Sequence, residues 1–147
     1  MSKSKFTYIG VEIICFLFIF LFVYAALSKL LDFQNFLAQL GQSPLLGRIV
    51  WWVAWIIPLT EILISIMLML SRWRRLGLYA SFCLMVMFTC YIIAITRFST
   101  HIPCTCGGVL QNMRWNQHLV FNLGFVLLSL MGILLYDNQP KNNVAHA

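Results

Sequence analysis

The chain has 147 residues, of which 61% are hydrophobic and only 10% are charged. A soluble domain carries about a quarter of its residues as Asp, Glu, Lys or Arg, so this composition excludes a water-soluble fold and indicates a membrane protein. At about 20 residues per crossing, four helices and their connections use the whole length and leave no room for a second domain. The net charge of +6 lies at the ends of apolar runs rather than in a basic stripe, which argues against nucleic-acid binding.

The first apolar run predicts a membrane span over about residues 8–31. Because the run is longer than the ~7–15 apolar residues of a cleaved signal peptide, we expect the span to be retained. The segment from Asp32 to Leu40 has apolar side chains on one helical face and amide side chains on the other. This pattern predicts a short helix in the membrane interface, capped by Asp32 and ended by Gly41.

Three further spans are expected over about residues 44–70, 76–98 and 118–136. Ser43 and Pro44 are typical of a helix start, and Pro58 inside the second span predicts a kink. Gly124 and Gly132 in the last span predict close approach of neighbouring helices. With a polar tail over residues 137–147, the prediction is one all-α membrane domain: a four-transmembrane-helix bundle with a short interfacial helix after the first span.

The basic residues predict the orientation of the spans. The densest cluster, Arg72 to Arg75, lies in the shortest loop, where the positive-inside rule is most reliable. Placing that loop in the cytoplasm also puts both termini there, and puts the loop before the last span outside. In a bacterium this is the periplasmic side of the inner membrane, where disulfides persist. The cytoplasmic side then carries Lys3, Lys5, Arg72, Arg74, Arg75 and Lys141, and the other side carries Lys29, Arg48, Arg97 and Arg114.

The polar loop before the last span contains two thiols one residue apart, Cys104 and Cys106. A disulfide between them would close a very small, strained ring, and strained, exposed disulfides are the exchangeable ones. Such a ring constrains almost no chain entropy, so it would be a poor structural crosslink. We therefore predict a redox-active pair, with His101 and Arg114 nearby to favour the thiolate.

Metal binding is the alternative interpretation of this loop. Structural zinc sites usually space their thiols by two to four residues and use four ligands. Copper(I) needs fewer soft ligands, so Cys104, Cys106 and His101 form an alternative copper site. Three further cysteines lie within spans, where Cys usually behaves as a small, inert apolar residue: Cys15, Cys83 and Cys90.

The spans also contain ionisable side chains, which are costly in a membrane. Glu61 lies three residues after Pro58, and Lys29 at the outer end of the first span is its expected partner, with Arg97 as the next choice. An ion pair, a protonated Glu61 bonded to the carbonyl freed by Pro58, and a proton-handling role all fit this position. His118 at the start of the last span fits either proton exchange with the thiols or a place at a wet interface.

Three motifs occur in order along the chain: Ser28-Lys29-x-x-Asp32-Phe33, Pro58-x-x-Glu61, and Cys104-x-Cys106-Gly107 before the last span. In this order, over about residues 8–136, they resemble the MauE/DoxX family of redox-associated membrane proteins, most of all its methylamine-utilisation MauE branch. The resemblance implies a four-helix membrane protein in thiol–disulfide exchange outside the cytoplasm. It also implies a thioredoxin-like partner and maturation of a disulfide-rich methylamine dehydrogenase subunit.

The chain departs from related patterns at two points. The family loop often has an aromatic residue between Cys and Gly, whereas Gly107-Gly108 follows Cys106 directly. The four-helix quinone-linked disulfide oxidoreductases are similar in architecture, but they use Cys-x-x-Cys and a second shuttle pair, which this chain lacks.

The leading hypothesis is a membrane thiol–disulfide redox protein with a thioredoxin-like periplasmic partner, embedded in lipid and compatible with a larger membrane complex. The alternative is a non-catalytic subunit or copper-binding accessory protein of an envelope complex. No cofactor is required, while quinone and copper are both compatible with the residues. The candidate catalytic residues are Cys104, Cys106 and His118, and the supporting residues are His101, Arg114, Glu61 and Lys29.

Overall fold

The computed structural model describes residues 2–42, 46–98 and 115–138 of the 147. The described residues are helical apart from short turns and contain no strand, which confirms the all-α prediction. The elements are α1 (Ser2–Leu31), α2 (Phe33–Gly41), the 3₁₀ helix η1 (Gly47–Ile49), α3 (Val50–Met69), α4 (Arg74–Phe98) and α5 (Trp115–Asp137).

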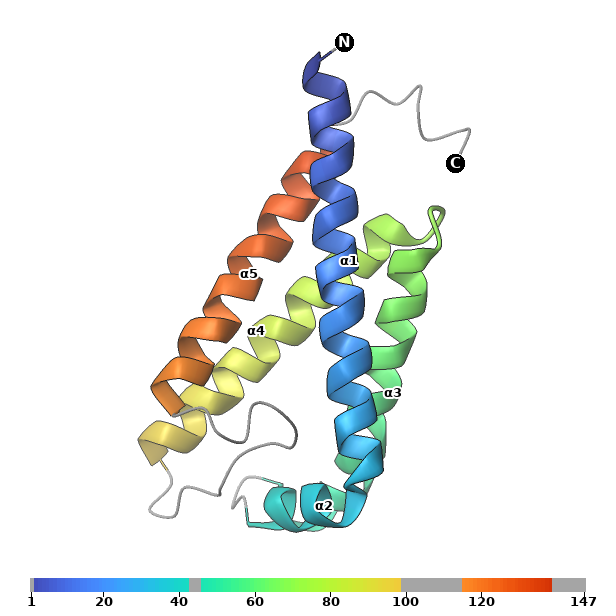
Figure 1. Cartoon of the computed structure of the whole chain (residues 1–147). Helices are drawn as coiled ribbons and strands as arrows, with labels where there is room; N and C mark the ends of the chain where they lie inside the picture. Colours follow the sequence, from blue (N-terminus) through green and yellow to red (C-terminus); the bar gives the residue numbers. More distant parts are fainter. Residues whose placement is uncertain (1, 43–45, 99–114, 139–147) are drawn as a thin grey trace.

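The four long helices form a bundle in which α1 packs against α3 and α5, while α4 packs against α3 and α5 (Figure 1). The start of α1, the turn between α3 and α4, and the end of α5 lie together, and we call this the terminal end. At the opposite end, α2 lies across the end of α1, beside the start of α3. The end of α4 and the start of α5 are also on this side, which we call the α2 end.

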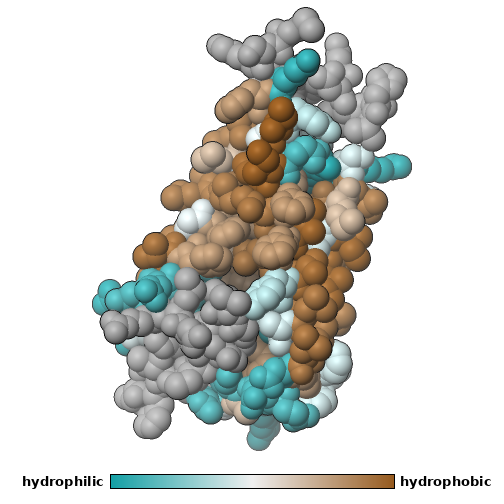
Figure 2. All heavy atoms as spheres, in the orientation of Figure 1, coloured by the Kyte–Doolittle hydropathy of each residue, from teal (hydrophilic) through white to brown (hydrophobic). Residues whose placement is uncertain are grey.

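Four helices are long and apolar enough to cross a membrane: Lys5–Leu31, Gly47–Met69, Arg74–Ala94 and Asn116–Asp137. Hydrophobic side chains cover the middle of the visible face, and hydrophilic side chains gather toward both ends (Figure 2). Large apolar residues such as Phe16, Phe20 and Leu127 point outward, as expected for a surface in contact with lipid. The protein is therefore a multi-pass membrane protein, and the predicted four-span bundle is confirmed.

The main core fills the space between α1, α3, α4 and α5. Phe18 and Phe22 of α1 are buried at its centre, and the ring of Phe18 meets the ring of Phe125 edge-on at 5.3 Å between centroids. Their buried neighbours come from all four long helices: Val11, Ile14, Cys15, Ile64, Leu68, Leu78, Leu84, Met85 and Ile133. The two ends of the sequence thus share one core, because the first and last helices meet at Phe18 and Phe125.

A second, smaller core holds α2 against the start of α3. Phe36 and Leu40, four residues apart on α2, pack their buried side chains against Ala54. Phe33 lies between two tryptophan rings, 5.9 Å from Trp51 and 4.9 Å from Trp55 between centroids. The apolar face of this short helix is therefore covered by protein, and the predicted helix after the first span is confirmed with Gly41 as its last residue.

The helix boundaries differ from the predicted ones at two points. Asp32 precedes α2 but makes no side-chain capping bond, because its carboxylate instead accepts hydrogen bonds from the amide of Asn35 at 2.9 and 3.0 Å. The second span begins about three residues later than predicted, at Gly47, whose φ of 40° is the left-handed conformation that glycine adopts readily. The expected helix start at Ser43 and Pro44 lies outside the described residues, and α3 continues without a break through Pro58.

The glycines show where helices approach closely. A Cβ added at Gly132 would lie 3.0 Å from Ile14 Cγ2 and 3.2 Å from Leu78, so the close approach predicted there is confirmed. The same prediction for Gly124 is wrong, because nothing lies within 4 Å of its Cβ position. Among the glycines that the structure describes, Gly77 in α4 lies closest to another backbone, because an added Cβ would lie 3.1 Å from the backbone nitrogen of Leu68 in α3.

Candidate functional site

Two charged side chains are buried together near the α2 end of the bundle. Lys29 lies in the last turn of α1, and its Nζ is 2.7 Å from Oε1 of Glu61 in α3. Glu61 is 1% exposed and Lys29 is 9% exposed. The Lys29 ammonium also donates to the carbonyl of Ala25, one turn earlier, at 3.2 Å. The predicted Lys29–Glu61 ion pair is confirmed, whereas Arg97 is exposed at the end of α4.

The sequence around Glu61 places its side chain toward α1. Pro58 has no N–H, so it cannot bond the carbonyl of Ala54 one turn earlier, and a protonated Glu61 was one candidate to do so. In the structure Glu61 bonds Lys29 instead. The hydroxyl of Ser65 donates to the Glu61 carbonyl at 2.9 Å, which keeps this part of α3 hydrogen-bonded within itself.

The second carboxylate oxygen of Glu61 has no hydrogen-bond partner among the described residues, and we call it the open oxygen. This oxygen, Oε2, is buried. Leaving a buried polar atom unsatisfied costs about 1–3 kcal/mol, and more for a charged group. Such atoms are few in native proteins, and each calls for a specific explanation.

His118 adds a third ionisable group to this part of the bundle. It lies in the first turn of α5 and is 8% exposed, so its imidazole is buried rather than placed in water. Lys29 is the charged side chain that acts electrostatically on it. Asn122, one turn further along α5, is also buried. We call Lys29, Glu61, His118 and Asn122 the polar layer.

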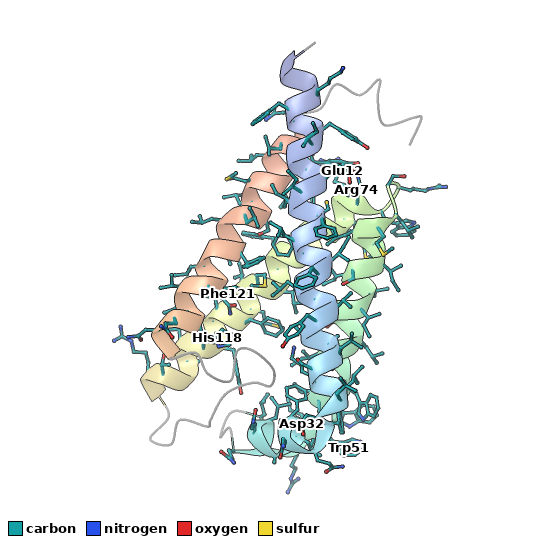
Figure 3. All side chains as sticks on the ribbon, viewed as in Figure 1. Glu12, Asp32, Trp51, Arg74, His118 and Phe121 are labelled. Atoms are coloured by element: carbon teal, nitrogen blue, oxygen red, sulfur yellow. The ribbon has the colours of Figure 1, made fainter. Side chains whose placement is uncertain are left out.

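The polar layer lies on one side of the main core. Figure 3 shows His118 near the start of α5, toward the same end of the bundle as Asp32 and Trp51. Three different helices supply its members, α1, α3 and α5. Such a cluster is difficult to predict from the sequence, because Lys29 and His118 are far apart along the chain. The motif Pro58-x-x-Glu61 and the polar start of the last span were the signals that could find it.

The other predicted site residues, His101, Cys104, Cys106 and Arg114, lie outside the described residues. These include all three alternative copper ligands. Within the part of the chain that the structure describes, no group of three or more His, Cys, Asp or Glu side chains could hold a metal ion. The segment with the thiols joins the end of α4 to the start of α5, and both of these helix ends lie at the α2 end.

The three cysteines within the spans occupy two environments. Cys15 is buried in the main core, as expected for a small apolar residue. Cys83 and Cys90 of α4 are free and exposed on the outer surface of the bundle. Neither of these two is therefore part of the buried core, although both lie in a span.

An ion pair at the terminal end was not predicted. Arg74, the first residue of α4, pairs through Nη1 with Oε1 of Glu12 in α1, and its Nε donates to the carbonyl of Leu68 at 3.2 Å. Figure 3 shows Glu12 and Arg74 close together, away from His118. Antiparallel spans place the start of the first span beside the basic turn, and this signal could have identified the pair.

Comparison with protein families decides the relationship. The family model described as "Methylamine utilisation protein MauE" matches residues 7–135. The chain belongs to the MauE family. The matched range contains the two ion pairs of α1, the polar layer and the thiol pair, while the DoxX part of the resemblance stays a prediction. No curated protein and no solved structure matches the chain.

The chemistry available to this MauE-family bundle follows from its polar layer. The Lys29 ammonium supplies a fixed positive charge, and it is already committed to Glu61 and to a carbonyl of its own helix. The open oxygen of Glu61 can accept a hydrogen bond or a proton. The imidazole of His118 has one nitrogen that can accept a proton and another that can donate one. The layer can therefore handle protons inside an otherwise apolar bundle.

Proposed function

We propose that this MauE-family protein is a thiol–disulfide redox protein of the bacterial inner membrane. It exchanges electrons through Cys104 and Cys106 with a thioredoxin-like partner on the periplasmic side. The observation that carries the proposal is the buried His118 in the first turn of α5, directly after the segment with the thiols. An imidazole at this position is a suitable acid and base for thiols.

The proposed reaction is reversible and needs no further reactant. A thiolate of the reduced partner attacks one sulfur of the Cys104–Cys106 disulfide, which breaks that S–S bond and forms a mixed disulfide. The second partner thiolate attacks the mixed disulfide and releases the reduced pair. Two electrons and two protons pass from the partner to Cys104 and Cys106, and His118 moves protons between attacking and leaving sulfurs.

Trapping of the mixed disulfide tests this function. In the Cys104→Ser or Cys106→Ser variant, one remaining thiol can attack a partner, but no second thiol of the pair can resolve the product. We expect one of the two variants to accumulate a disulfide-linked, thioredoxin-like protein, and the double variant to accumulate none. If neither single variant traps a protein, and the pair stays reduced in oxidising glutathione while copper co-purifies, the copper-binding accessory protein replaces this proposal.

Accessibility tests the orientation. With the basic turn in the cytoplasm, a membrane-impermeant maleimide should label the reduced thiol pair in cells whose outer membrane is permeabilised. The Cys104→Ser, Cys106→Ser double variant is the control, because it retains Cys83 and Cys90 on the outer surface of α4. Labelling that needs lysis of the inner membrane would reverse the orientation.

A further inference from the structure

The open Oε2 of Glu61 distinguishes the Lys29–Glu61 pair from an ordinary structural ion pair. Glu61 is 1% exposed, so bulk solvent and lipid headgroups do not reach Oε2, and no described residue bonds it. A buried ion pair contributes to stability only when its remaining lone pairs are also satisfied, because the desolvation of both charges opposes their attraction. An open oxygen at this position therefore weakens the fold, and a chemical role is the better explanation.

The ionisable groups around Glu61 are few. Lys29 of α1 contacts it directly, and Lys29 in turn acts on His118 of α5. Within the described residues, the other helices that pack on α3 bring no competing charge to it. Their charged side chains are paired at the terminal end or exposed: Asp32 before α2, Arg48 of η1, and Arg74, Arg75 and Arg97 of α4. The geometry therefore singles out Glu61 as a buried proton acceptor with Lys29 as its fixed charge, and His118 of α5 is the further ionisable group on which Lys29 acts.

We propose that Glu61, Lys29 and His118 form a proton-transfer site that serves the thiol pair. Lys29 occupies one oxygen of Glu61 and leaves the other as the proton acceptor. When a proton moves inward from His118 to the ion pair, an N–H bond of His118 breaks and an O–H bond forms on Glu61. No electron moves in this step, and the layer holds one additional proton on either residue. The inference rests on the proposed thiol–disulfide function, in which His118 exchanges protons with the sulfurs.

The arrangement explains why the site combines a lysine with a carboxylate. Without Lys29, burial in this apolar place would favour the neutral carboxylic acid over the carboxylate that accepts a proton. Without Glu61, the ammonium would be an uncompensated charge inside the bundle. Together the two charges compensate each other and leave Oε2 of Glu61 as the acceptor, while His118 lies at the start of α5. Glu61 and Lys29 are thus positioning and proton-storing residues rather than residues that touch the substrate.

Infrared difference spectroscopy of the full chain in lipid nanodiscs tests the proposal. Changing the thiol pair between oxidised and reduced states should change the C=O band of a protonated carboxyl group. We expect this band to be absent in Glu61→Gln and displaced in Glu61→Asp. Glu12→Gln is the matched control, because it removes the carboxylate of the other ion pair of α1, at the terminal end, and should leave the band unchanged. The exchange rate should fall about tenfold in Glu61→Gln, below the 10²–10⁴-fold of a direct acid–base group, and should recover in Glu61→Asp.

The outcomes separate this inference from the function on which it rests. If the thiols change redox state and no Glu61-dependent band appears, the proton-transfer site is overturned and the thiol–disulfide function stands. If the thiols do not exchange at all, the function fails, and a difference spectrum between low and high pH decides the site alone. A Glu61-dependent band in that spectrum supports a proton site, and its absence overturns one. If Glu61→Gln does not fold, the displaced band in Glu61→Asp decides.

Discussion

Two ion pairs connect α1 to other helices, one at each end of the bundle, and they are built differently. At the terminal end, Arg74 bonds both Glu12 and the carbonyl of Leu68, and the side chains of Arg74 and Glu12 are 15% and 39% exposed. At the α2 end, the side chains of Lys29 and Glu61 are 11% and 1% exposed, and one carboxylate oxygen is open. The two pairs lie 17 residues apart along α1 (29 − 12), about 25 Å at 1.5 Å per residue.

The difference shows how a structural pair and a chemical one are distinguished. A guanidinium presents several donors in a rigid fork, so Arg74 fastens three helices while water or headgroups can reach Glu12. An ammonium is a compact charge, and Lys29 satisfies only one oxygen of a carboxylate that nothing else reaches. Burial without full hydrogen bonding weakens a fold. The pair at the α2 end is therefore the one that we expect to have a function beyond joining helices.

The largest loss of stability should come from breaking the buried Lys29–Glu61 ion pair. Glu61→Gln leaves the Lys29 ammonium uncompensated in the bundle, and this should lower the free energy of unfolding by about 3–5 kcal/mol. The double variant Lys29→Met, Glu61→Gln removes both charges and should lose less than the single variant. Unfolding in detergent, followed by circular dichroism, measures both. Losses that add in the double-mutant cycle would mean that the two residues do not interact.

The second-largest loss of stability should come from disturbing the close helix packing at the terminal end. Gly77 lies against the backbone of Leu68, whose carbonyl accepts the bond from Arg74, so Gly77→Ala must move α3 from α4. Overpacking of this kind should cost about 1–3 kcal/mol. Gly124→Ala is the control, because its Cβ position is open and alanine is the better helix former. Equal midpoints of thermal unfolding for the two variants would contradict the close approach.

The stability of the protein should depend less on the ion pair at the terminal end than on the Lys29–Glu61 pair. Glu12→Gln removes the charge of the terminal pair but keeps a side chain that can accept a bond from Arg74. Because Glu12 is 39% exposed, we expect a loss of about 1 kcal/mol, well below that of Glu61→Gln. The same unfolding measurement applies. A loss as large as that of Glu61→Gln would remove the distinction between the two ends.

The smallest loss of stability should come from removing the exposed Arg75–Asp137 ion pair, also at the terminal end. Arg75 Nε lies 3.2 Å from Asp137 Oδ1, but the two side chains are 63% and 39% exposed. Exposed pairs contribute about 0–1 kcal/mol, so Arg75→Ala should change the midpoint of unfolding little, and added salt should reduce even that change. A salt-independent loss would indicate that Arg75 is more buried in the membrane-embedded protein.

The sequence predicts the bundle well because each span depends on local composition. The four apolar runs and the alternating faces of Asp32 to Leu40 are properties of neighbouring residues, and the structure has a helix at each. The Lys29–Glu61 pair was also predictable, since a charge in a span needs a partner and few are available. Helix contacts are not local. Gly124 and Gly132 look alike in the sequence, yet only Gly132 meets another helix closely, because this depends on how α5 is rotated against α1. The Glu12–Arg74 pair was missed, although the antiparallel order of the spans places Glu12 beside the basic turn.

The sharing of α1 between α3 and α5 has a consequence for how the protein is made. One side of α1 contacts α3, which follows it closely along the chain, but Ile14 and Phe18 contact Gly132 and Phe125 of α5. During synthesis, that second side has only lipid as a neighbour until the last helix has been inserted. We expect insertion of α5 to complete the assembly, so that premature termination before Trp115 leaves the α5-facing side of α1 without its partner helix. We expect membrane quality control to recognise this uncovered side in truncated chains.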